Sequence, residues 1–100
     1  MDIREQEQHF ERMMAKIGQT MLKKGNDYAD LDRLSNFKKA GEICGMSAEQ
    51  QCLSLIATKV ARLGILINGK APNNEAIRDS VLDLTTYSIL LDAILFEQEL

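Results

Sequence analysis

The chain has 100 residues, 45% of them hydrophobic, with only six glycines and one proline. This length fits one small domain, residues 1–100, and the shortage of turn-forming residues favours helices over strands. A net charge of −3 has the wrong sign for a general nucleic-acid binder. No uncharged apolar run reaches 18 residues and no signal peptide is recognisable, so we expect a cytoplasmic protein without a membrane partner.

The first predicted helix starts at a capping box formed by Asp2 and Glu5. Lys23 and Lys24, followed by Gly25, predict its end. Its apolar stripe consists of Ile3, Phe10, Met14, Ile17 and Met21, with Met13 beside it. Methionines on one helical face are typical of core or interface packing more often than of an adaptable binding groove.

Residues 25–36 form the only long irregular segment, and they are rich in polar side chains. They do not follow the calcium-loop pattern of an EF-hand. Two interpretations remain open for Asp27, Tyr28, Asp30 and Asn36: turn and cap chemistry, or a functional loop. A short helix should follow, capped by Ser35 and ended by Gly45.

A second capping box, Ser47 to Gln50, predicts a helix to about Asn68, with Gly69 as its stop. We expect its core stripe to be Leu53, Ile56, Val60, Leu63 and Ile67. A second stripe, about 100° away, is Leu55, Lys59, Arg62 and Leu66. Its two cations predict a carboxylate or phosphate partner, or else solvated side chains on an amphipathic helix. Cys44 and Cys52 have no metal-ligand spacing, and we expect reduced core thiols.

The last predicted helix, capped by Asn74, carries Glu75, Asp79 and Asp83 on one stripe that Tyr87 continues. Its second half is apolar around the whole circumference, which predicts a central rod surrounded by protein. Because the preceding connection is short, the last two helices should pack antiparallel. The acidic stripe then either pairs with Lys59 and Arg62 or holds Mg²⁺, which prefers oxygen ligands.

Several dispersed signatures occur in one order: Lys24-Gly-Asn-Asp27-Tyr28, Asn36-Phe37, Lys59-x-x-Arg62 and Glu75-x-x-x-Asp79-x-x-x-Asp83-x-x-x-Tyr87. In this arrangement the chain resembles the phage and bacterial nucleotide-modification-associated domains of the first type. The resemblance covers roughly residues 20 to 95 and implies a setting in nucleotide or DNA-base modification.

The acid-bearing last helix is also similar to that of the MazG-like all-α NTP pyrophosphohydrolases, which bind Mg²⁺ through acid pairs on two helices. Asp79 and Asp83 resemble the second pair with its spacing stretched by one residue. The first pair is missing, and Lys59 and Arg62 stand on the face where acids would be expected.

We therefore expect an all-α four-helix bundle with one short helix. It should form a homo-oligomer through the apolar end of the last helix and the methionine stripe. The resemblance implies a nucleotide-handling protein of a phage or bacterium, and in the enzymatic version a Mg²⁺-dependent (d)NTP pyrophosphohydrolase. The alternatives are a binding protein that sequesters a nucleotide without chemistry and a structural or adaptor oligomer. The expected site comprises Glu75, Asp79 and Asp83 for the metal, Lys59, Arg62 and Lys24 for phosphate, Tyr28 and Asn36 for the base, and Asp27, Asp30 and Tyr87 as further candidates.

Overall fold

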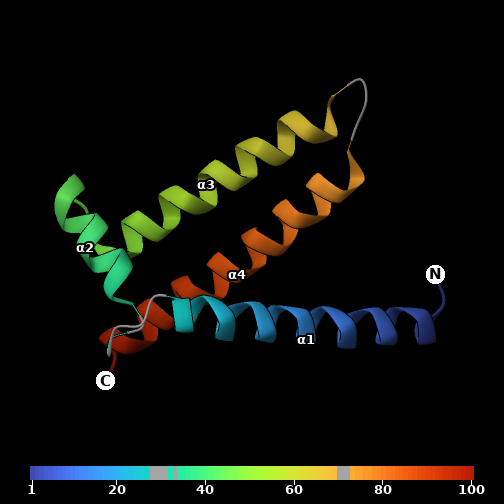
Figure 1. The fold of residues 1–100 in the computed structure, drawn as a ribbon, viewed down its shortest axis with the longest axis horizontal. Helices are drawn as coiled ribbons and strands as arrows, with labels where there is room; N and C mark the ends of the chain where they lie inside the picture. Colours follow the sequence, from blue (N-terminus) through green and yellow to red (C-terminus); the bar gives the residue numbers. More distant parts are fainter. Residues whose placement is uncertain (28–31, 33, 70–72) are drawn as a thin grey trace.

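Four α-helices make up the computed structural model, which describes residues 1–27, 32, 34–69 and 73–100, without the side chains of residues 24–27. The helices are α1 (Ile3–Asp27), α2 (Ser35–Cys44), α3 (Ala48–Ile67) and α4 (Asn74–Gln98), and the described residues contain no strand. This confirms the predicted all-α fold with a short second helix. α3 and α4 run antiparallel side by side, also as predicted (Figure 1).

Two helix starts follow the predicted capping chemistry. The Asp2 carboxylate accepts a hydrogen bond from the Glu5 backbone N–H at 2.8 Å, and the Glu5 carboxylate accepts one from the Asp2 N–H at 3.2 Å. Ser47 and Gln50 form the same reciprocal pair at the start of α3. α2 ends at Gly45, whose φ of 68° is the left-handed conformation that glycine tolerates best.

Three predicted boundaries were wrong by one to three residues. The cap of α4 is Asn73, whose side chain accepts from the Ala76 N–H at 3.1 Å. α2 has Leu34 at its N-cap with no side-chain cap bond. α1 continues past Gly25 to Asp27, because glycine weakens a helix without having to end it.

A small apolar core lies where α2, the start of α3 and the end of α4 meet. Its buried members are Leu34, Phe37, Cys52 and Ile94. Cys52 is completely buried, and its thiol donates to the backbone carbonyl of Tyr87 at 3.4 Å. Burial raises the pKa of this thiol, because the charged thiolate would lose its hydration. Cys44, in contrast, is exposed, so the prediction of two core thiols was half wrong.

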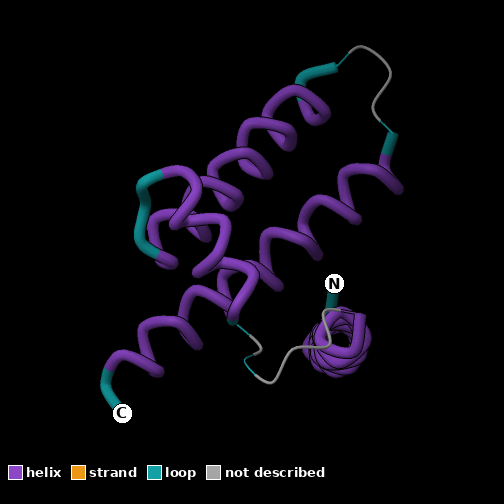
Figure 2. The backbone as a smooth tube through the Cα atoms, turned by 60° about the vertical axis from the view of Figure 1, so that its left-hand side comes forward, coloured by secondary structure: helices purple, strands orange, loops and turns teal. Residues whose placement is uncertain are grey.

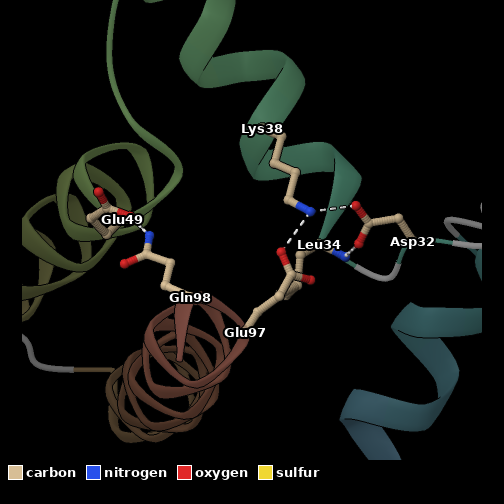
Figure 3. Close-up of polar contacts among 6 residues, drawn as sticks. All are labelled: Asp32, Leu34, Lys38, Glu49, Glu97 and Gln98. Atoms are coloured by element: carbon tan, nitrogen blue, oxygen red, sulfur yellow. Dashed lines mark hydrogen bonds and ion pairs between the residues drawn. The ribbon is translucent and has the colours of Figure 1, made fainter. Parts of the chain in front are cut away.

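Polar side chains hold the same junction together at its rim (Figure 3). Lys38 on α2 donates to Asp32 at 2.6 Å and to Glu97 on α4 at 2.7 Å. The bond from Lys38 holds the pKa of the Asp32 carboxyl below its usual value, and the two carboxylates raise the pKa of Lys38. Gln98 donates to Glu49 at the start of α3. The end of α4 is thereby tied to α2 and to α3.

Helix α1 lies on the side of α4 away from α3, and only part of its length contacts α4 (Figure 2). On its predicted core stripe Ile3, Phe10 and Met14 are exposed, whereas Ile17 and Met21 are partly covered. α4 is likewise covered on part of its circumference, and Ile89, Leu95 and Phe96 remain exposed. The prediction that this helix is surrounded by protein is therefore wrong for a single chain.

Candidate functional site

The charged ridges of α3 and α4 meet at one ion pair. Lys59 Nζ lies 3.1 Å from Asp83 Oδ2, and the two side chains are 27% and 34% exposed. Lys59 reaches this position because the stripe with Leu55 and Leu66 faces α4. Of the two partners predicted for Lys59, a carboxylate or a phosphate, the structure contains the carboxylate.

Three other charged residues of the predicted site that the structure describes form no ion pair with Lys59 or Asp83. Arg62, one turn further along α3, is exposed and makes no ion pair with a described residue. Glu75 and Asp79, in the first two turns of α4, are also exposed. The described residues contain no group of three His, Cys, Asp or Glu side chains close enough to hold a metal ion. The magnesium site therefore stays a prediction.

Arg62 lies at the rim of a shallow hollow of about 470 Å³ along α3. The other lining residues described are Thr58, Ala61, Ile65 and Leu66, so the surface combines one cation and one hydroxyl with apolar side chains. A planar apolar group with an attached anion has the matching chemistry.

The other candidates are scattered. Tyr87 is partly buried and packs against the apolar core, and Asn36 is exposed on α2. The side chains of Lys24 and Asp27, and the whole of Tyr28 and Asp30, lie outside the described residues. The prediction that Tyr28 and Asn36 bind the base together therefore remains untested.

A second candidate site is the side of α3 that faces away from α4. Three residues predicted for the core lie there: Leu53, Val60 and Ile67 are 56%, 52% and 60% exposed. The small residues Ala57 and Gly64 lie between them. We name these five residues the α3 seam.

The sequence contained the signal for this surface, because apolar or small residues at alternating spacings of four and three mark a helix-pairing face. The prediction that Leu53, Val60 and Ile67 belong to the core is therefore wrong for a single chain. In the structure the core side of α3 carries Cys52, Leu55 and Leu66, together with Ile56 and Leu63 of the predicted stripe, which are partly covered.

Comparison of the chain with family models, with curated proteins and with solved structures gave no match.

Proposed function

We propose that the protein acts by assembly, as the subunit of a helical homo-oligomer with a structural or adaptor role. The observation that supports this proposal most directly is the exposed surface of the single chain, 7534 Å². A compact monomer of 11.2 kDa exposes only about 5,700 Å². Each chain thus exposes about 1,800 Å² more than its mass requires.

The distribution of apolar side chains supports the same proposal. Sixteen large apolar side chains among the described residues are exposed, whereas the buried apolar residues number five. The radius of gyration of 15.6 Å also exceeds the value of about 13 Å for a compact chain of this length. A subunit of an obligate oligomer has these properties, because its core is completed by other copies.

Sedimentation velocity of the wild-type protein over a wide concentration range tests this proposal. We expect the mass to be a multiple of 11.2 kDa, with dissociation linked to loss of helix on dilution. A folded monomer at every concentration would contradict it. Circular dichroism on the same samples distinguishes a folded monomer from an unfolded one.

A second candidate is the binding of a nucleotide or a nucleotide-derived phosphorylated molecule, for which Arg62 and its hollow are the favouring observation. A guanidinium without a described carboxylate partner is suited to bind phosphate, and Ile65 and Leu66 offer apolar contact to a base. In the enzymatic version Asp83 would have to exchange Lys59 for Mg²⁺ while Glu75 and Asp79 supply further oxygens.

Thermal shift with nucleoside mono-, di- and triphosphates, with and without Mg²⁺, tests this second candidate. A binding protein gains stability from the ligand and returns it intact, and Arg62→Gln removes the gain. An enzyme consumes (d)NTPs only with Mg²⁺, and Asp83→Asn abolishes the reaction. Lys23→Gln on α1, another exposed cation, is the matched control for loss of charge.

A further inference from the structure

The α3 seam is uncharged along its whole length, and its large side chains, Leu53, Val60 and Ile67, stay more than half exposed. The charged residues of α3 are Glu49 in its first turn, Lys59, which faces α4, and Arg62 at the rim of the hollow. In Figures 1 and 2 α3 lies at the edge of the molecule, with α2 beside its start, α4 along one side and α1 beyond α4. An exposed apolar face of this length requires a covering partner.

We propose that the α3 seam pairs with the α3 seam of a second copy in an antiparallel arrangement. This inference rests on the proposed function and specifies its interface. Obligate homodimers bury about 1,000–2,500 Å² per subunit. The excess surface of the whole chain, about 1,800 Å², falls within that range, and the α3 seam supplies part of it.

The alternation of large and small residues favours the antiparallel orientation. In a parallel pair each residue faces its own copy, so Gly64 and Ala57 would form thin layers between the thick layers of Leu53 and Val60. The thick layers would hold the helices apart and leave voids at the thin ones. In an antiparallel pair Leu53 can lie opposite Gly64 and Val60 opposite Ala57, so the four central layers have a similar volume, and Ile67 lies opposite Gln50 at each end.

The register follows from the extent of the helix. Placing Leu53 opposite Gly64 of the second copy also places Ala57 opposite Val60. In this register the two α3 helices overlap over nearly their full length, Ala48–Ile67. A shift by one heptad would shorten the overlap to residues 57–67 in one direction and to residues 48–62 in the other. No atom outside the helix lies within 4 Å of a Cβ built on Gly64, so this position is open to a side chain of the second copy.

A lipid bilayer is the competing occupant, because α3 is long and apolar enough to span a membrane by composition. However, Lys59 and Arg62 lie near the middle of the helix. A cation at the centre of a bilayer opposes insertion even by the most favourable insertion scales. The second copy is therefore the better match.

Cysteine cross-linking tests the orientation and the register in a Cys44→Ser background, which leaves only the fully buried native thiol of Cys52. Leu53→Cys and Gly64→Cys are prepared separately, mixed, allowed to exchange subunits and oxidised with copper phenanthroline. We expect disulfide-linked dimers in the mixture and none in either variant alone. The two copies of residue 53 should lie eleven residues apart along the pair, about 16 Å, which is too far for a disulfide.

A substitution on the seam tests the same surface without cross-linking. Val60→Lys places a charge in each half of the interface, and we expect the dimer dissociation constant to rise by roughly 100-fold or more. Ile43→Lys on α2 is the matched control, because it makes the same chemical change at an exposed apolar residue away from the seam. The control should leave the mass unchanged.

Each other outcome overturns a stated part of the inference. Disulfides in each single variant would show a parallel pair. An oligomeric protein without cross-links, and with a mass unchanged by Val60→Lys, would place the interface on another face while the proposed function stands. A folded wild-type monomer would refute the proposed function itself, and flotation of the wild-type protein with phospholipid vesicles would assign the seam to lipid.

Discussion

The ion pair between Lys59 and Asp83 should contribute measurably to stability, and a double-mutant cycle isolates its contribution. The variants are Lys59→Met, Asp83→Asn and the combination, which replace each charge by a group of similar shape. Asp83 has a further interaction besides Lys59, so the cost of a single variant would not equal the contribution of the pair. The cycle removes that additional cost if the two interactions are independent.

The expected coupling energy follows from distance and exposure. At 3.1 Å and an effective dielectric constant of about 20, the gross attraction is about 5 kcal/mol. Desolvation and loss of side-chain freedom reduce an exposed pair to about 0.2–1 kcal/mol. Because Lys59 and Asp83 are only 27% and 34% exposed, we expect a coupling energy at the upper end, about 1 kcal/mol.

Urea unfolding followed by circular dichroism at one fixed protein concentration measures the cycle, since the stability of an oligomer depends on concentration. The control cycle combines Arg62→Met with Asp83→Asn, and its coupling energy should be near zero. A Lys59–Asp83 coupling energy no larger than that of the control would refute the structural role of the pair. Asp83 would then become a better candidate for a ligand-binding carboxylate.

Three further predictions concern the ends of the helices. Gly41→Ala should lower the free energy of unfolding in urea by roughly 1–3 kcal/mol, because the new Cβ would lie 2.7 Å from the backbone oxygen of Met46. Gly18→Ala is the control and should not destabilise the protein, since no atom lies within 4 Å of the new Cβ there. Cys44 should react with Ellman's reagent at once, and Cys52 only as fast as the protein opens, so a rapid reaction of two thiols would contradict the buried core. Lys38→Met should destabilise the protein in urea unfolding, and this loss of stability should shrink as the pH falls through the folded-state pKa of Asp32, which is lowered below 3.8. A loss of stability independent of pH would refute the Lys38–Asp32 ion pair.

The sequence predicted the helices well because their boundaries depend on local chemistry. A capping serine, asparagine or aspartate binds backbone N–H groups within three residues, and a glycine such as Gly45 adopts a left-handed turn regardless of distant contacts. The antiparallel packing of α3 on α4 also followed from a short connection. The rim contact of Lys38 with Glu97 joins residues that are distant in sequence, and no local pattern predicts it.

The sequence did not predict which face of α3 is covered, because the helix has two apolar stripes and its neighbouring helices, α2 and α4, cover only part of its circumference. Hydrophobicity favoured the stripe of Leu53 and Val60, which has no charge. The structure instead covers the stripe that contains Lys59, because Asp83 neutralises it there. An apolar stripe that includes one paired cation can thus be covered in place of a purely apolar one.

The orientation of α3 about its own axis therefore determines both the Lys59–Asp83 ion pair and the exposure of the α3 seam. Turning the seam toward α4 would carry Lys59 about 100° away from Asp83, since neighbouring residues are separated by that angle on a helix. It would also withdraw Cys52 from the core, where it is fully buried. The contacts that stabilise the single chain therefore leave Leu53, Val60 and Ile67 outside it. A chain that places its charged stripe inward and its uncharged stripe outward gains further burial only from a second molecule, and for this reason assembly is the function that the geometry supports best.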